Sequence, residues 1–256
     1  MNLFDLTGKV IAVIGGASGI GEAVARGAAA MGATVVILDA NEAAAQTVAS
    51  QFGGGAAALD IRDASAVRSA FDAIVLVRGS LDVVICTPSI NVRKPILQYS
   101  SDDFDHVVAV NLKGSFNVLQ AAGRLMTAQR RGSIVIFSSI RAQVVEPGQS
   151  VYAMTKAGIV QLVRTAAVEY GAHGVRVNAV APGIVETPLT APIKENAEWH
   201  AAYASKSVLK RWASAEEMVG PTLFLASDAA SYVTGTILFA DGGWTAVDGR
   251  FTPPGM

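Results

Sequence analysis

Short, continuously apolar runs alternate with longer alanine-rich segments along most of the chain, and no other feature constrains its fold as strongly. Strands that are apolar on both faces are typical of a parallel sheet covered by helices on both sides. The segments between them have the length of helices and would form the right-handed crossovers that such a sheet needs. The sequence therefore predicts an α/β fold, a Rossmann-type doubly wound parallel sheet of about seven strands with helices on both faces.

The expected strands are Val10–Ile14, Thr34–Asp39, Ala56–Leu59, Leu81–Cys86, Ser133–Ser138, Val175–Ala181 and Thr236–Ala240. The expected helices are Ile20–Met31, Glu42–Phe52, Ala64–Arg78, Asp102–Arg130, Val151–His173 and Ala215–Ala226. No repeat or linker separates them, so residues 1–256 are expected to form a single domain. Residues 186–212 interrupt the alternation and are long enough to form a lid. Residues 245–256 form a proline-rich tail, either frayed or docked on a neighbouring subunit through Phe251.

The charge balance argues against several classes of partner. Lys and Arg number 20 against 21 Asp and Glu, so no basic excess points to nucleic acid or an anionic membrane.

No uncharged apolar run reaches the ~20 residues needed to cross a bilayer. Met1–Lys9 lack the pattern of a secretory signal. The single cysteine, Cys86, fits a reducing compartment, and the three histidines lack metal-ligand spacing. We therefore expect a cytoplasmic protein without a metal site.

Two of the expected helices are apolar around most of their circumference. The first carries Phe116, Val118 and Met126, and the second carries Met154 and Val168 among other large apolar side chains. A helix on the outside of a sheet can bury a second apolar face only against another subunit. The pattern favours a homodimer or homotetramer, and a locally thick core is the alternative.

A glycine-rich loop follows the first expected strand and leads directly into a helix. Glycines at such a position allow a tight turn and let backbone N–H groups approach a pyrophosphate at the helix N-terminus. An ordinary glycine-rich turn is the alternative, but the strand before the loop and the helix after it favour a dinucleotide. The loop residues expected to contact the cofactor are Gly15, Ser18, Gly19, Ile20 and Gly21.

An acidic residue, Asp39, ends the second expected strand. Its carboxylate can accept hydrogen bonds from the ribose hydroxyls of the adenosine and would repel a 2′-phosphate. None of Ala17, Ser18 and Ala40 is the basic residue that would bind such a phosphate. The sequence therefore predicts NAD rather than NADP, unless Asp39 is merely a solvated strand end. Asp60, at the end of the third strand, is an expected second contact, to the adenine edge.

A tyrosine and a lysine four residues apart, Tyr152 and Lys156, share one face of an expected helix. Free tyrosine has a pKa of about 10, which a nearby ammonium and the positive nicotinamide ring would lower. Tyr152 is thus expected to take the proton of an alcohol or return it to a carbonyl. Ser139, at the carboxyl end of the fifth strand, is placed to hydrogen-bond the reacting oxygen. The amide of Asn111 is expected to hold a water against Lys156. A solvated helix face remains the alternative interpretation of the Tyr–Lys spacing.

Taken together, these residues resemble the short-chain dehydrogenase/reductase family from Lys9 to Trp244. The resemblance rests on Gly15-x-x-x-Gly19-x-Gly21, Asp60-Ile61, Asn111, Ser139, Tyr152-x-x-x-Lys156, Asn178, Pro182-Gly183 and the closing Asp241-Gly242-Gly243. It implies a catalytic tetrad of Asn111, Ser139, Tyr152 and Lys156. It also implies nicotinamide contacts from Lys156, Val185 and Thr187, and further cofactor contacts from Ile61, Cys86 and Pro88.

The chain departs from the family pattern at two places. Ile14 stands where the family usually has threonine, which removes a hydroxyl from the glycine turn. Cys86-Thr87-Pro88-Ser89 replaces the usual Asn-Asn-Ala-Gly, so proline removes a backbone donor and serine adds a side chain. The cofactor pocket is expected to differ locally, without loss of activity because the tetrad is complete.

Polar side chains surround the expected reaction centre. They are Asn91, Arg93, Lys94, Arg141, Gln143, Glu146 and Gln149, with Trp199, His200, Tyr203 and Arg211 in the expected lid. This set favours a small polyhydroxylated or carboxylated substrate, a sugar, polyol or sugar acid, with Arg141, Gln149 and Trp199 as candidate contacts. The region is similar to sugar and sugar-acid dehydrogenases of the family, such as gluconate 5-dehydrogenases. Alternatively, part of the set faces solvent.

The sequence thus predicts an NAD-dependent oxidoreductase that moves a hydride between nicotinamide and a secondary alcohol or carbonyl. A 3-oxoacyl thioester reductase is the second possibility, although it would favour NADPH and a basic residue near Asp39. A catalytically silent NAD-binding scaffold is the third, supported only by the altered segment Cys86–Ser89.

Overall fold

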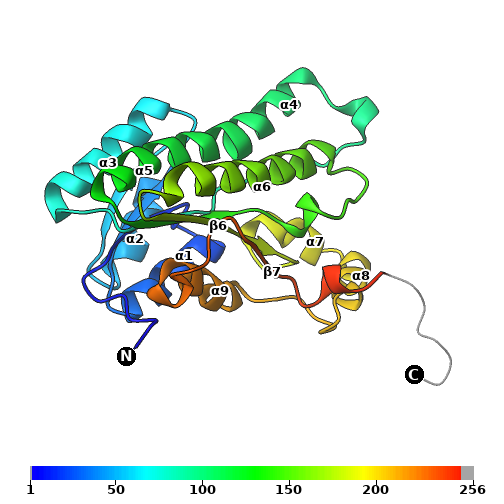
Figure 1. The fold of residues 1–256 in the computed structure, drawn as a ribbon. Coiled ribbons are helices and arrows are strands. Elements are labelled where there is room, and N and C mark those ends of the chain that lie inside the picture. The colour runs from blue at the N-terminus through cyan, green and yellow to red at the C-terminus, as the bar shows by residue number, and fades with distance from the viewer. Residues whose placement is uncertain (1, 249–256) are drawn as a thin grey trace.

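One parallel sheet organises the protein. The computed structural model describes residues 2–248, and its seven strands lie in the order β3-β2-β1-β4-β5-β6-β7 (Figure 1). The strands are β1 Val10–Ile14, β2 Thr34–Asp39, β3 Gly55–Ala58, β4 Val83–Cys86, β5 Gly132–Phe137, β6 Val175–Pro182 and β7 Ile237–Ala240. The predicted Rossmann-type fold is confirmed. Strand order reverses between β1 and β4, which opens a crevice at the carboxyl ends of these strands.

Helices cover both faces of the sheet, as Figure 1 shows. Residues of α3 (Ala64–Arg78), α5 (Ser115–Gln129) and α6 (Ser150–Gly171) pack with one face in one apolar core. Residues of α1 (Gly19–Ala30), α2 (Glu42–Ser50) and α9 (Val219–Ala226) pack against the other face in a second core. No helix within residues 2–248 is both long and apolar enough to cross a membrane.

The long helix expected over Asp102–Arg130 is interrupted. It consists of α4 (Ser101–Val108), a π-helical turn (Ala109–Gly114) and α5. Apolar periodicity does not reveal such a turn, because the chain is helical on both sides of it. A π turn inserts an extra residue and redirects the side chains that follow, which is why it is common at functional sites.

Residues 186–212, expected as a lid, contain two helices that the sequence did not predict. These are α7 (Ala191–Lys194) and α8 (Ala197–Lys206), which lie beyond the carboxyl end of β6 (Figure 1). Ile193, Tyr203 and Trp212 form a small apolar core of their own. The lid region is therefore a packed substructure. Of the predicted tail 245–256, the part from residue 249 onward, including Phe251, lies outside the described residues.

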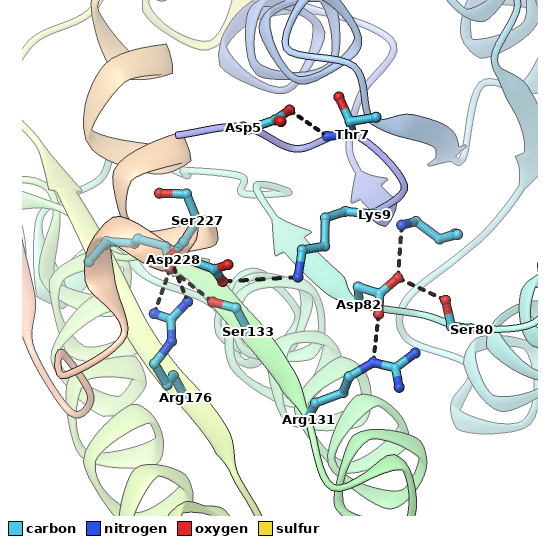
Figure 2. A network of polar contacts seen from close by, with 12 residues as sticks. Asp5, Thr7, Lys9, Ser80, Asp82, Arg131, Ser133, Arg176, Ser227 and Asp228 are labelled. Carbon is cyan, nitrogen blue, oxygen red and sulfur yellow. Dashed lines mark hydrogen bonds and ion pairs between the residues drawn. The ribbon is translucent and has the colours of Figure 1, made fainter. Parts of the chain in front are cut away.

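At the amino-terminal edge of the sheet, a buried carboxylate joins two strands. Asp82, directly before β4, accepts hydrogen bonds from the backbone N–H of Val10 at 3.0 Å, from Ser80 at 2.7 Å and from Arg131 at 3.1 Å (Figure 2). Burial by itself raises the pKa of Asp82, but these hydrogen bonds outweigh it and lower the pKa below its usual value. The carboxylate is thus fully engaged in fixing the start of β1 to the start of β4.

The neighbouring strands at this edge are joined to α9 in the same way. The guanidinium of Arg176, in β6, donates to the carbonyls of Leu225 at 2.8 Å and Ser227 at 3.0 Å (Figure 2). Ser133, in β5, donates to Leu225 at 2.9 Å. These bonds satisfy the carbonyl groups at the end of α9, which would otherwise lack partners. The edge is a closed polar network.

Candidate active site

A groove of about 530 Å³ runs along the carboxyl edge of the sheet beside the strand-order reversal. Its lining includes most of the cofactor contacts expected from the sequence: Gly15, Ser18, Gly19, Ile20, Gly21, Asp39, Asp60, Ile61, Pro88 and Thr187. A cavity of this size is typical of a site for a cofactor or another small molecule.

The glycine loop fits the close approach of backbone that a pyrophosphate requires. Gly19, the first residue of α1, has a φ of +53°, a conformation that favours glycine. A Cβ at Gly21 would lie 2.1 Å from the carbonyl oxygen of Gly15, so no other residue fits there. The free N–H groups at the start of α1 and its dipole favour an anion. The residues present therefore fit the phosphates of a dinucleotide.

Two carboxylates that line the groove, Asp39 and Asp60, differ in their surroundings. Asp39 accepts from the backbone N–H groups of Ala17 at 3.1 Å and Asn41 at 2.9 Å. Asp60 instead pairs with Arg62 at 2.6 Å, and this hydrogen bond lowers the pKa of Asp60. Arg62 also lines the groove and was missed by the sequence reasoning, although its place directly after Asp60-Ile61 was a usable signal.

The altered segment after β4 compensates for the missing threonine in the glycine turn. Thr87 donates its hydroxyl to the carbonyl of Ile14 at 2.9 Å and lies 3.2 Å from that of Gly15. A hydroxyl therefore still braces the turn, supplied by the neighbouring strand. Cys86 does not line the groove as expected: it is buried in the core beneath α5, and burial raises the pKa of its thiol to about 12.

The groove leads to a smaller cavity of about 100 Å³, where three of the four expected catalytic side chains meet. Ser139, Tyr152 and Lys156 line it, together with Val185 and Thr187. Ser139 lies just after β5, and the other two lie on α6, one turn apart. The packing of α6 on the sheet thus brings the start of α6 next to the carboxyl end of β5.

Lys156 is buried and makes no hydrogen bond to the Tyr152 hydroxyl among the described contacts. Its Nζ donates to the carbonyl of Phe137 at 2.9 Å and lies 5.5 Å from the ring centroid of Tyr152. Burial lowers the pKa of Lys156 to about 8. A lysine with this pKa changes its charge near neutral pH and can respond to groups bound beside it.

The pKa of Tyr152 moves in the direction opposite to the one expected. Burial raises it above 10, while the hydroxyls of Ser139 and Ser89 and the guanidinium groups of Arg141 and Arg93 act to lower it. Lys156 is not among these groups, and its Nζ donates to the backbone of β5. At neutral pH the phenol keeps its proton, which makes it a proton donor.

Asn111 lies in the π-helical turn and is fully buried. Its side-chain amide accepts from the backbone N–H of Ile90 and donates to the Ile90 carbonyl, each at 2.9 Å, and also donates to Thr155 at 3.2 Å. Both amide N–H groups are therefore engaged, and the expected water against Lys156 could be held only by the second lone pair of Oδ1. Asn111 instead fixes the loop after β4, and with it the wall of the groove.

A buried hydroxyl without a partner lies between the groove and the inner cavity. Ser89 lines both, and its Oγ makes no hydrogen bond of good geometry, although it lies near enough to the Tyr152 phenol to lower the pKa of that phenol. Buried hydroxyls almost always have partners, so one that lacks a partner marks a place where a ligand binds. From the sequence, Ser89 is expected only to depart from the usual glycine, and no role is predicted for it.

The third cavity, of about 240 Å³, adjoins Ser139 and Tyr152 on the side away from the groove. Arg141, Gln149 and Trp199, the expected substrate contacts, all line it, as do Asn91 and Arg93. The lid region contributes its apolar wall, Leu189, Pro192 and Ile193. Lys94 does not line it and pairs with Asp103 at 2.6 Å. The sequence reasoning missed the apolar wall, because its residues follow no periodic pattern.

The known proteins that resemble this chain include reductases and dehydrogenases that act on different substrates. A family model described as enoyl-(acyl carrier protein) reductase matches residues 15–245. The 3-oxoacyl-(acyl-carrier-protein) reductase of Thermotoga maritima is 37% identical over 93% of this chain and 98% of its own length. The cis-4-hydroxycyclohexanecarboxylate dehydrogenase of Sinomonas cyclohexanicum is 41% identical over 93% and 97%. A crystal structure of a gluconate 5-dehydrogenase from Burkholderia cenocepacia, in complex with NADP and tartrate, has a TM-score of 0.93, with 33% identity over 96% and 98%.

Proposed function

The chain belongs to the short-chain dehydrogenase/reductase family, oxidoreductases that act on alcohol and carbonyl groups, and we propose that it is an NAD-dependent dehydrogenase of a small polar substrate. The observation that carries the proposal is the small cavity where Ser139, Tyr152 and Lys156 meet at the end of the groove. A sugar, polyol or sugar acid is the proposed substrate class, with a secondary alcohol or its carbonyl as the reacting group.

The bound cofactor supplies the nicotinamide carbon that takes a hydride from an alcohol or returns it to a carbonyl. Tyr152 handles the proton. In reduction its phenol, which is protonated at neutral pH, donates to the forming alcohol oxygen, and in oxidation the phenolate accepts the proton. Ser139 donates a hydrogen bond to the same oxygen, since its Oγ already accepts from the Arg141 backbone N–H at 3.1 Å.

Lys156 and Asn111 act as supports in this scheme. The Lys156 ammonium favours the phenolate once it turns toward Tyr152, and its pKa of about 8 lets it release or take up a proton near neutral pH. Asn111 keeps the Ile90 backbone in place through two hydrogen bonds. Val185 and Thr187, at the opposite wall of the inner cavity, are the proposed contacts of the nicotinamide end.

The preference for NAD is proposed on the ground of charge. Asp39 lines the adenosine end, where its carboxylate would repel a 2′-phosphate. Arg62, the nearby cation, is paired with Asp60. The NADP in the related gluconate 5-dehydrogenase crystal structure supports the opposite preference. Measuring turnover with both cofactors decides between them.

The size of the substrate cavity supports a small substrate over a long acyl thioester. About 240 Å³ lies below the range typical of drug-sized ligands. Two of the relatives are named for small hydroxylated acids, gluconate and cis-4-hydroxycyclohexanecarboxylate. The 3-oxoacyl thioester of the Thermotoga relative is therefore an outcome of the test rather than the proposal.

We also propose a homodimer or homotetramer in the cytoplasm, with residues 186–212 acting as the lid. The large side chains Val118, Met126 and Ile159 face the core, but Phe116, Met154 and Val168 are 44%, 42% and 82% exposed on the outer surface of α5 and α6. Such a surface favours pairing with a second copy. Light scattering after size exclusion measures the assembly, and a monomer at micromolar concentration would contradict it.

The test of function follows nicotinamide absorbance with NAD and NADP in parallel, across sugars, sugar acids, polyols and 3-oxoacyl thioesters. Turnover of one small hydroxylated class with NAD, abolished in Tyr152→Phe, is the expected result. Preference for NADP would contradict the argument from Asp39. Turnover of thioesters alone would contradict the substrate class. Cofactor binding without any turnover would support the silent scaffold instead.

A further inference from the structure

Arg141 places a buried guanidinium beside the reacting groups. It follows Ser139 by two residues, its side chain is about 5% exposed, and it lines the 240 Å³ cavity together with Tyr152. Burying an arginine is costly unless an anion lies close to it. The position of this charge therefore calls for an explanation in terms of what the cavity binds.

A second guanidinium, Arg93, lines the same cavity, and no acidic residue does so among the described residues. The nearest carboxylate, Glu146, pairs with Arg93 at 2.8 Å and with Arg141, and also accepts from the hydroxyl of Tyr203. Glu146 lines the adjoining cavity instead. Two positive groups held by one negative group leave a net charge of +1 facing the substrate.

Both guanidinium groups lie over the face of an indole ring. Arg141 lies over the ring of Trp244 at 5.4 Å, and Arg93 over the ring of Trp199 at 5.0 Å. A guanidinium held over an indole face by cation–π attraction keeps N–H donors available for a planar anion. Glu146 takes up only part of the donors of each group. The arrangement is therefore preorganised for one further carboxylate.

A buried acceptor completes the set. Asn91 lines the cavity and donates to Gln149 at 3.0 Å, but its Oδ1 is buried without a partner. An acceptor of this kind fits a donor on the ligand, such as a hydroxyl. The cavity thus offers donors for an anion, an acceptor for a hydroxyl, and an apolar wall.

We propose that Arg141 and Arg93 form a subsite for a carboxylate of the substrate, so that the enzyme selects hydroxy acids over neutral alcohols of the same size. This inference rests on the proposed function and narrows its substrate class. A singly charged carboxylate matches the net charge of the subsite, and a phosphate ester, with up to two charges, matches it less well.

The first experiment measures binding and does not need turnover. Cyclohexanecarboxylate, its primary amide and cyclohexyl phosphate are titrated into the enzyme with NADH bound, and quenching of tryptophan fluorescence reports occupancy beside Trp199 and Trp244. We expect the acid to bind about 10- to 100-fold more tightly than the amide, because hydrogen bonds to charged groups are the stronger ones. Equal binding of acid and amide, or binding of neither, overturns the proposal. Tighter binding of the phosphate overturns the assignment to a carboxylate.

The second experiment removes the charges one at a time. Arg141→Gln and Arg93→Gln are each expected to reduce the ratio of acid to amide affinity about 10-fold or more, and Arg141→Lys to reduce it less. Arg124→Gln, which breaks an exposed ion pair between α5 and α3, is the matched control. If Arg141→Gln fails to fold, the ratios of acid to amide affinity in Arg141→Lys and Arg93→Gln still test the proposed subsite. An unchanged ratio in all variants sinks the proposal.

Turnover separates this inference from the one on which it rests. The same variants are assayed with D-gluconate and D-gluconamide, and the ratio of kcat/KM for acid over amide is expected to fall with the ratio of affinities. Turnover confined to neutral polyols would contradict the subsite and leave the dehydrogenase function standing. Selective binding of the acid with no turnover of any substrate would support the subsite and contradict the function.

Discussion

The two edges of the sheet are both rich in polar groups, but among the described residues only the carboxyl edge leaves buried side-chain polar atoms without partners. At the amino edge, Asp82 accepts from three donors, and Arg176 satisfies the carbonyls at the end of α9 (Figure 2). Three buried polar atoms without partners occur among the described residues, on Ser89, Asn91 and His200. The first two line the cavities of the carboxyl edge, and the third lies in α8 of the lid region.

This difference separates stability from function along a single sheet. A buried polar group that already has its partners contributes to folding, and its removal leaves other groups unpaired. A buried polar group that lacks a partner lowers stability until a ligand supplies one. Substitutions at the amino edge should therefore change stability alone, and those at the carboxyl edge should change turnover with smaller or opposite effects on stability.

The largest effect is expected for Tyr152→Phe. Removing the hydroxyl takes away the proton donor but hardly changes the packing of the ring, so kcat should fall by about 10²- to 10⁴-fold. Nicotinamide absorbance measures turnover, calorimetry measures NAD binding, and a thermal melt measures stability. Binding and melting temperature should remain close to those of the parent enzyme. A large drop in melting temperature would place Tyr152 with the structural residues instead.

Asp82→Ala is expected to have the second largest effect, on stability. The change leaves the Val10 N–H, the Ser80 hydroxyl and the Arg131 guanidinium without their acceptor, which should cost about 1–3 kcal/mol in the free energy of unfolding. Urea denaturation measures this loss, and kcat of the folded enzyme should not change. A loss of kcat at unchanged stability would contradict the assignment of the amino edge to stability and the carboxyl edge to turnover.

The same variant carries a pH dependence. The pKa of Asp82 in the folded protein lies below its usual 3.8, so its contribution is present at neutral pH and disappears as pH falls through the folded pKa. The stabilities of Asp82→Ala and its parent should therefore converge at strongly acidic pH. Parallel curves down to pH 3 would contradict the role assigned to the carboxylate.

Lys156 should give a smaller effect at alkaline pH, where the stability of the parent should again rise with pH. Its pKa is about 8 in the folded protein against 10.5 in the unfolded chain, so the unfolded state holds the extra proton between these values. The free energy of unfolding of the parent should then rise with pH relative to Lys156→Met, by about 1–2 kcal/mol between pH 8 and 9.5. Denaturation at both pH values tests this. If the parent and Lys156→Met differ by the same free energy of unfolding at pH 8 and at pH 9.5, the pKa of Lys156 is not lowered by folding.

The smallest effect is expected for Lys9→Ala at the amino edge. Lys9 lies 3.9 Å from Asp228, and both side chains are substantially exposed (Figure 2). An exposed pair of this kind contributes between about 0 and 1 kcal/mol. The variant is thus a control for Asp82→Ala in the same denaturation series. A loss as large as that of Asp82→Ala would mean that the network, rather than the buried carboxylate, holds this edge.

Prediction from the sequence was accurate where the signal is local. The strands Val10–Ile14 and Thr34–Asp39 have the bounds that their apolar runs indicate, because burial on both faces imposes that composition directly. The glycine spacing placed the groove, since Gly21 has no room for a side chain. Prediction was less accurate for the lid region, where α7 and α8 are short and packed against residues distant in the chain.

The role of several side chains was decided by neighbours that spacing does not reveal. The sequence placed Asn111 in the tetrad, but only the fold shows its amide committed to Ile90. Likewise, Lys156 was expected to lower the pKa of Tyr152, whereas its Nζ donates to Phe137 and burial raises that pKa. Hydrogen-bond partners depend on distances of a few tenths of an ångström, which residue types alone do not specify.

The sequence by itself determined the sheet, the place of the cofactor groove and the residues Ser139, Tyr152 and Lys156, because hydrophobic periodicity and fixed spacing are properties of the chain. The tertiary structure alone decided that Glu146 pairs with both Arg93 and Arg141. It also decided that, within residues 2–248, the buried side-chain atoms without partners lie at the carboxyl edge of the sheet and in α8. These groups come from loops and helices far apart in sequence. Their mutual distances, and hence the field they create, exist only once the strands have packed in order.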